Sequence, residues 1–173
     1  WNTQSFTGRA THKLKLFQSL SQLTFDAAEM QIEQVSLRET QGDGKPVQLK
    51  HESRDRQLIA PLGKEFLADT ELEVEIAYRV TKPKHGAHFV MPDAGEPDQP
   101  KMVWTQSEPE YARYWYPCFD SPNDRLTSEI IATVPKEYYV LSNGALKEKR
   151  DNDNNTRTWH WVHQLLSGKA LPV

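Results

Sequence analysis

The sequence has little cysteine and lacks any long apolar run. Cys118 is the only cysteine among 173 residues, which excludes an internal disulfide but assigns no cellular compartment, because many exported proteins also lack disulfides. No apolar stretch approaches the roughly 20 residues that span a bilayer. We therefore expect a soluble domain without a membrane segment.

An excess of charge of one sign is also missing. The chain carries 21 basic and 24 acidic residues, for a net charge of −3, and the basic residues are scattered along the sequence. A nucleic-acid-binding domain is usually basic, with its lysines and arginines clustered on one face. We therefore expect no nucleic-acid partner.

No segment shows helical periodicity with capping residues, and the dominant apolar period is two. The clearest example runs from Glu71 to Val80, where apolar side chains alternate with charged ones. This pattern predicts a strand with one buried and one solvated face. Short turn signals separate the predicted strands, such as Gly42-Asp43-Gly44-Lys45-Pro46 directly before the segment that begins at Val47.

Other segments are predicted to be strands on the same grounds. These are Ala10–Leu16, Leu23–Ala27, Met30–Val35, Val47–His51, Leu58–Ala60, Ile130–Val134, Tyr138–Leu141, and a hairpin of Ala145–Lys149 with Thr156–Val162. Pro61-Leu62-Gly63 is expected to break the chain, Lys82–Pro100 to form a long surface loop, and Leu165–Val173 to be an irregular tail. The fold predicted is all-β, a saddle-like sandwich of many short, mostly antiparallel strands in a single domain, residues 1–173.

One stretch, residues 102–125, combines many aromatic side chains with a few polar ones. Aromatic groups beside sparse polar groups are typical of the wall of a binding cleft. The polar members of this stretch include Gln106, Glu108, Arg113 and Asp120. A Gln-x-Glu pair alone is more often an ordinary surface pair, so further information is needed to interpret it.

That information comes from the order of the residues. Thr105-Gln106-Ser107-Glu108, Ala112-Arg113 and Tyr116–Pro122 together resemble the T-Q-x-E-x-x-x-A-R-x-x-F-P-C-F-D-x-P signature of zinc metallopeptidases of the aminopeptidase N type, with Tyr116 in place of the usual phenylalanine. Leu23–Ala27 is similar to the L-x-L-D-A segment of that family, and Leu141–Gly144 to its strand before the catalytic domain. The resemblance extends over nearly the whole chain.

The resemblance implies a fold and a role for each matching residue. The chain would be the family's N-terminal β domain, which packs against a catalytic zinc domain absent from this chain. Gln106 would line the pocket for the first side chain of a peptide, and Glu108 would bind its free α-amino group, because a carboxylate pairs with an ammonium group. Arg113 and Asp120 would form a buried structural ion pair.

The family's metal motif, H-E-x-x-H with a distant glutamate, does not occur in the sequence. The nearest string is His51-Glu52-Ser53-Arg54-Asp55, and on a strand positions four apart lie roughly 13 Å from each other, too far to share one zinc ion. His85 and His88, like His160 and His163, would point to opposite faces of a strand. Cys118 lies in an apolar run that favours buried packing over nucleophilic reactivity. We therefore expect no catalytic residue, metal site or cofactor in this chain, and zinc in the full-length protein.

Two alternatives stay open. The family includes a transcription-factor subunit that has lost its zinc ligands, so the domain could be a protein-interaction scaffold. A free-standing sandwich that binds ligands through an exposed surface of Trp104, Tyr114 and Trp115 is the other alternative. The expected partners on the first interpretation are the N-terminus of a peptide substrate and the catalytic domain of the same protein.

Overall fold

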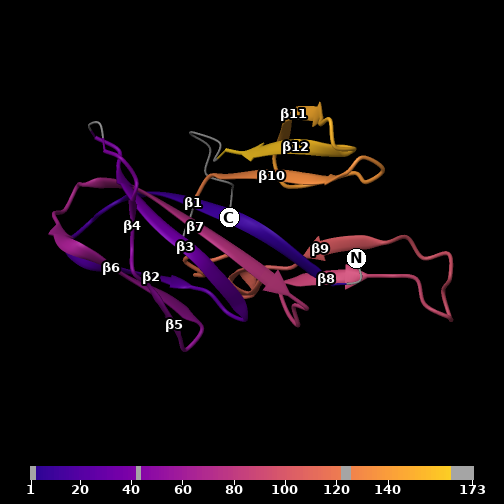
Figure 1. The fold of residues 1–173 in the computed structure, drawn as a ribbon, viewed down its shortest axis with the longest axis horizontal. Coiled ribbons are helices and arrows are strands. Elements are labelled where there is room, and N and C mark those ends of the chain that lie inside the picture. Colours follow the sequence, from indigo (N-terminus) through magenta and orange to yellow (C-terminus); the bar gives the residue numbers. More distant parts are fainter. Residues whose placement is uncertain (1–2, 42–43, 122–125, 165–173) are drawn as a thin grey trace, which may run out of the picture. The chain divides into compact units, whose positions relative to one another are not determined.

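The computed structural model describes residues 3–41, 44–121 and 126–164. The chain divides into two compact units, Trp1–Asp124 and Arg125–Val173, and its regular elements are almost all strands (Figure 1). They are β1 Ser5–Lys15, β2 Leu20–Asp26, β3 Met30–Glu39, β4 Val47–Gln48, β5 Glu52–Arg54, β6 Gln57–Phe66, β7 Glu71–Thr81, β8 Ala87–Val90, β9 Met102–Thr105, the 3-10 turn η1 Ala112–Tyr114, β10 Ser128–Pro135, β11 Ala145–Asp151 and β12 Thr156–His163. This composition confirms the prediction of an all-β fold, and no helix among the described residues is long and apolar enough to cross a membrane.

The first sheet of the larger unit has the order β1-β7-β3-β4, with antiparallel neighbours. The alternation in β7 decides which of its faces is buried. Leu72, Val74, Ile76, Tyr78 and Val80 are all buried, as the period of two predicts.

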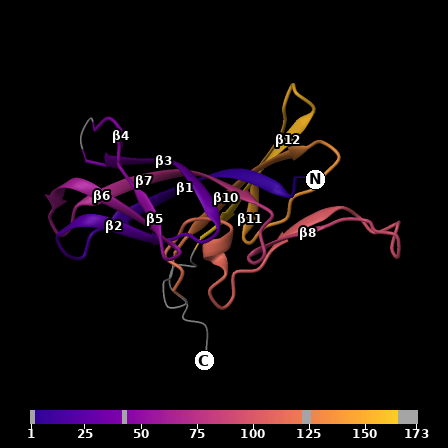
Figure 2. The ribbon, with the colours of Figure 1, turned by 60° about the horizontal axis from the view of Figure 1, so that its bottom comes forward.

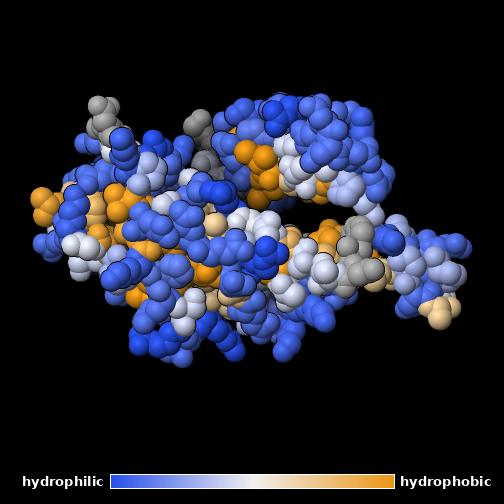
Figure 3. Space-filling view, in the orientation of Figure 1, coloured by the Kyte–Doolittle hydropathy of each residue, from blue (hydrophilic) through white to orange (hydrophobic). Residues whose placement is uncertain are grey.

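The other face of this sheet is solvated. Arg38 pairs with Glu73 at 2.7 Å, and Arg9 pairs with Glu75, in both cases across neighbouring strands. Hydrophilic side chains cover most of the face of the molecule seen in Figure 3. Exposed pairs of this kind contribute little to stability, on the order of 0 to 1 kcal/mol each, so the fold depends mainly on the buried face.

A second sheet, β2-β6-β5, packs against that buried face. The shared core joins Phe25 of β2 and Leu58 of β6 to Val35 of β3 and Ile76 of β7, and none of these four side chains is accessible to solvent. Full burial of one such side chain is worth about 1.5 to 3 kcal/mol. The larger unit is therefore a β-sandwich whose two sheets share an apolar core, and Ala10, Tyr78 and Val80 form a second, smaller apolar cluster.

Two predictions within this unit were wrong. Pro61 does not break the chain, because β6 continues through it to Phe66. Strand β5 pairs with β6 only as far as Ile59, and the register of β2 against β6 shifts beside Pro61; an open edge or a bulge is where a strand tolerates proline. The Lys82–Pro100 stretch is not loop throughout, because Ala87–Val90 forms β8 and pairs with β9.

The smaller unit is a three-stranded sheet of order β10-β12-β11. Its β11–β12 hairpin confirms the predicted pairing, and Trp159 is its most buried side chain. The predicted strand Tyr138–Leu141 is not formed. Because β10 and β11 lie on opposite sides of β12, the connection between them has to cross that strand, and Tyr139 packs edge-on to the ring of Trp159, 4.3 Å between centroids.

Some predictions concern residues outside the described ranges. They are the Gly42-Asp43 part of the first turn, Pro122 of the signature, and the tail Leu165–Val173.

Candidate functional site

The two predicted substrate-binding residues lie on the segment that joins β9 to η1. The backbone N–H of Gln106 donates to the carbonyl of Gly86 at 2.8 Å, and the N–H of Tyr111 donates to the carbonyl of Ser107 at 2.8 Å. Gln106 and Glu108 are both exposed. The segment therefore has a tied backbone and presents an amide and a carboxylate to the solvent.

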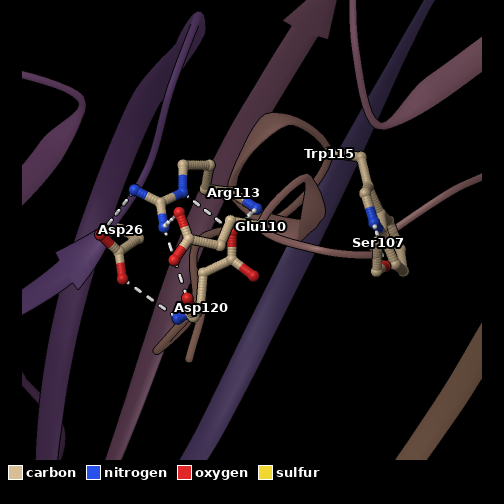
Figure 4. A network of polar contacts seen from close by, with 6 residues as sticks. All are labelled: Asp26, Ser107, Glu110, Arg113, Trp115 and Asp120. Carbon is tan, nitrogen blue, oxygen red and sulfur yellow. Dashed lines mark hydrogen bonds and ion pairs between the residues drawn. The ribbon is translucent and has the colours of Figure 1, made fainter. Parts of the chain in front are cut away.

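A side-chain hydrogen bond holds the residue between them. The indole Nε1 of Trp115 donates to Oγ of Ser107 at 3.2 Å (Figure 4). Trp115 follows η1 directly, and its backbone N–H donates to the carbonyl of Ala112 at 3.0 Å. The turn η1 thereby fixes one side of the segment.

Arg113, in the middle of η1, is the centre of a network of carboxylates (Figure 4). Its Nε donates to Oδ2 of Asp120 at 2.8 Å, its NH1 lies 3.3 Å from Asp26, and its NH2 lies 3.6 Å from Glu110. The Asp120 side chain is only 7% exposed and that of Arg113 is 19% exposed. Burial opposes the guanidinium charge, but the hydrogen bond that Arg113 donates to Asp120 and the nearby carboxylates outweigh burial and raise the pKa of Arg113. The ion pair predicted from the signature is confirmed, but both of its residues are only partly buried.

The network ties the signature to the sandwich. Asp26, the last residue of β2, exchanges two backbone hydrogen bonds with Cys118, at 2.7 and 3.0 Å, and its carboxylate accepts from the backbone N–H of Asp120 at 3.0 Å. Ala28 donates to the carbonyl of Arg113 at 2.8 Å. The turn η1 therefore lies beside the connection from β2 to β3 (Figure 2).

Aromatic rings pack together beside the segment that joins β9 to η1. The ring of His85 stacks on Tyr111, with 5.3 Å between centroids and planes 8° apart, and packs edge-on against Tyr114 at 5.0 Å. Gly86 has φ +74°, and a Cβ there would come within 2.5 Å of the Tyr111 carbonyl oxygen. Only glycine allows the two backbones to come this close.

The proposed stacking surface of three aromatic residues is not formed. Trp104 is 45% exposed and stacks on His88 at 4.2 Å, whereas Tyr114 is only 7% exposed. The period-two pattern could not reveal this, because η1 turns Tyr114 toward the interior of its unit.

Cys118 is buried, as its apolar surroundings predicted. Burial, together with the nearby carboxylates of Asp120 and Asp26, raises the pKa of its thiol to about 12. A thiol in that environment stays protonated at neutral pH and does not act as a nucleophile.

The paired histidines do not form a metal site. His160 bonds to Glu129 at 2.8 Å, while His88 stacks on Trp104. The string at His51 lies in and beside β5, a strand, as predicted. Within residues 3–41, 44–121 and 126–164, no group of three or more histidine, cysteine, aspartate or glutamate side chains could hold a metal ion.

Some residues of the site were not assigned from the sequence. Asp26 lies in the segment similar to L-x-L-D-A, which marked the residue but gave it no partner. Trp115 and Ser107 lie within the signature at positions that it leaves unspecified. Gly86 had no sequence signal beyond being a glycine in a stretch that was expected to be irregular.

Comparison with known proteins decides the family. Residues 1–166 match the family described as the peptidase M1 N-terminal domain. The chain belongs to this family. Among curated relatives of this M1 N-terminal domain, the glutamyl aminopeptidase of Rattus norvegicus is 29% identical over 158 residues, which are 87% of the chain and 16% of that protein.

Other relatives have a different name. Transcription initiation factor TFIID subunit 2 of Drosophila melanogaster is 29% identical over 109 residues, covering 60% of the chain and 9% of that protein. In structure, the M1 domain is similar to the M1 zinc metallopeptidase of Deinococcus radiodurans with bound Tyr-Ser-Ala substrate, with a TM-score of 0.74 and 17% identity over 93% of the chain and 35% of that protein. At that identity the likeness shows the fold alone. The chain spans less than a fifth of the length of these two curated relatives.

Proposed function

We propose that this chain is the non-catalytic N-terminal domain of a zinc aminopeptidase that removes N-terminal residues from peptides. Glu108 binds the α-amino group of the substrate, and Gln106 forms part of the pocket for its first side chain. Membership of the peptidase M1 N-terminal domain family supports this proposal, as do relatives named aminopeptidases.

One observation carries the proposal. Glu108 and Gln106 are exposed, while the backbone beside them is tied to Gly86 and to η1. Exposed side chains on a fixed backbone are what a binding site needs, because little ordering remains to be done when the ligand arrives. An ordinary surface pair has no need of such a support.

The chemistry of the anchor follows from charge. A carboxylate forms strong, charge-assisted hydrogen bonds with an ammonium group. An internal peptide bond offers no such group, so a carboxylate at this place selects the ends of chains.

The residues that the structure describes do not fit a zinc ion, since no group of three ligands exists among them. Zinc and the groups that act with it therefore belong, on this proposal, to the catalytic domain of the full-length protein. That domain is the expected partner of this chain, and the peptide N-terminus is its expected ligand.

The test is the Glu108→Gln substitution in the full-length protein. Removing one partner of a charged hydrogen-bonded pair typically costs 2 to 5 kcal/mol, so kcat/KM for a free-amine aminoacyl anilide should fall about 100-fold. Glu96→Gln is the matched control, because Glu96 is exposed in the connection between β8 and β9 and should change kcat/KM less than twofold. An unchanged kcat/KM in Glu108→Gln would contradict the anchoring role.

A second candidate is a protein-interaction scaffold, which the relatives named TFIID subunit 2 support. The presence of Glu108 argues against it, because a scaffold has no use for an amine anchor. Assay of the full-length protein with zinc and a panel of aminoacyl anilides separates the two: hydrolysis supports the aminopeptidase, and a complete lack of hydrolysis supports the scaffold. The binding module is disfavoured by the burial of Tyr114.

A further inference from the structure

Ser107 lies between the two residues of the proposed anchor, and its side chain is turned toward η1. Its hydroxyl accepts a hydrogen bond from the indole N–H of Trp115 at 3.2 Å (Figure 4). Its carbonyl accepts from the N–H of Tyr111 at 2.8 Å. These two bonds fix the backbone atoms from which the Gln106 and Glu108 side chains start.

Trp115 is itself held in place. Its ring lies against that of Tyr116, with 4.4 Å between centroids, and a Cβ at Gly86 would stand 3.2 Å from its Cδ1 atom. The backbone of Gly86 is in turn hydrogen-bonded to Gln106 at 2.8 Å. Gly86 therefore contacts the segment at two places. Its carbonyl accepts from the backbone of Gln106, and its Cα packs beside the indole ring of Trp115.

The family signature specifies Gln106, Glu108, Arg113 and Asp120 but leaves the positions of Ser107 and Trp115 open. The signature therefore does not account for the hydrogen bond between these two residues. This hydrogen bond joins the segment that carries Gln106 and Glu108 to η1, and the ion pairs of Arg113 hold η1 in place.

We propose that Trp115 is a positioning residue, whose hydrogen bond to Ser107 holds Gln106 and Glu108 in the arrangement that binds the substrate's N-terminus. This inference rests on the proposed function of Glu108. Because a pre-ordered site loses less conformational entropy on binding, loss of the bond weakens substrate binding and leaves the chemical step unchanged.

The test uses the full-length protein with Trp115→Phe, which removes the donor but keeps a ring, and Ser107→Ala, which removes the acceptor. Each should raise KM for a free-amine aminoacyl anilide about 5- to 10-fold, with kcat changed less than twofold. The double variant should be no worse than either single one, since both remove the same bond. Ser107→Thr keeps a hydroxyl and should restore most of the affinity.

Trp161→Phe is the matched control. Trp161 lies in β12, and its indole nitrogen has no hydrogen-bond partner within the described ranges of the chain, so the same change of ring should leave KM unaltered. A second readout is the ratio of activity on free-amine and Nα-acetylated substrates, which should fall in Trp115→Phe and stay constant in Trp161→Phe.

The outcomes separate the two proposals. If Glu108→Gln impairs turnover but Trp115→Phe and Ser107→Ala keep the wild-type KM, the positioning role is wrong and the anchor stands. If Glu108→Gln has no effect, the anchor is wrong and the positioning role falls with it. Additive effects in the double variant, or an equal rise in KM for Trp161→Phe, would also overturn the positioning role.

Discussion

The guanidinium of Arg113 donates from Nε to the Asp120 carboxylate at 2.8 Å, in a site where Asp120 is only 7% exposed. The same guanidinium reaches Asp26 and Glu110. It thus places one positive charge among three negative ones and joins the signature to the end of β2.

We expect Arg113→Met to destabilise the chain by about 2 to 3 kcal/mol, because it leaves partly buried carboxylates without their cation. Urea unfolding followed by tryptophan fluorescence measures this loss. Arg54→Met is the control, since Arg54 is 67% exposed and its carboxylates lie at 3.8 and 3.9 Å, and it should cost less than about 0.5 kcal/mol. Equal losses in the two variants would show that the network is not structural.

Gly86 and Gly63 form a matched pair of glycines. Both have positive φ, +74° and +76°, but a Cβ at Gly86 meets the Tyr111 carbonyl oxygen at 2.5 Å, whereas nothing lies within 4 Å at Gly63. Gly63→Ala should cost only the left-handed backbone penalty, about 1 to 2 kcal/mol. Gly86→Ala should cost clearly more, about 3 kcal/mol or above, because the backbone has to move as well. Thermal unfolding of both variants measures the difference, and equal midpoints would contradict the close contact.

Cys118 should lower the stability of the fold as the pH rises into the alkaline range. Burial raises the pKa of its thiol from 9.0 to about 12, so above pH 9 the unfolded chain releases a proton that the folded chain keeps. The free energy of unfolding should therefore fall between pH 9 and 12, by up to about 1.4 kcal/mol per pH unit from this group. Urea unfolding across this range should show a shallower fall in Cys118→Ala than in the wild type. The same slope in both would refute the assignment.

The thiol should also be protected from chemical modification. In the folded chain at pH 8, Cys118 should react with iodoacetamide at least about 100-fold more slowly than in urea, because the thiolate is the nucleophile and is scarce at a raised pKa. Mass spectrometry of quenched samples measures both rates. Rapid labelling under native conditions would show that the thiol is accessible.

His12 should lower the stability of the fold as the pH falls into the mildly acidic range. Burial lowers the pKa of its ring, only partly opposed by the hydrogen bond to the Pro117 carbonyl at 2.9 Å. The unfolded chain therefore binds a proton near pH 6.5 that the folded chain does not, and the stability is lost as the pH falls below that value. His12→Gln should lose less stability between pH 7 and 5 than the wild type, measured by urea unfolding at each pH. A parallel pH dependence in the two proteins would contradict this.

The local sequence pattern predicted strands correctly where a strand pairs along most of its length or with the segment next to it in the sequence. The alternation of β7 identified its buried face because each of its neighbours runs alongside nearly its full length. The hairpin of β11 and β12 was predictable because a polar turn separates two complementary segments. The ion pair of Arg113 and Asp120 was predicted from the resemblance to the family signature, which contains both residues, and the structure contains this pair.

Errors arose where a partner distant in the sequence decides the outcome. Tyr138–Leu141 has the composition of a strand, but the order β10-β12-β11 makes it a crossing connection. Pro61 has the chemistry of a break, but β6 tolerates it because β5 pairs only as far as Ile59 and the register of β2 shifts beside it. The role of Asp26 could not be predicted either, because its partners lie in a segment that no local pattern brings near β2.

The ties of the signature to the sandwich have a consequence for how the domain is made. His12 bonds to a carbonyl 105 residues away, and Asp26 to an amide 94 residues away. Contacts of such separation form only after the intervening chain has closed a large loop, which makes them slow and late in folding. The ribosome therefore adds the residues of β1 and β2 long before it adds Pro117 and Asp120, which bond to these strands. Pro117 and Asp120 therefore reach their final positions only after both of these loops have closed.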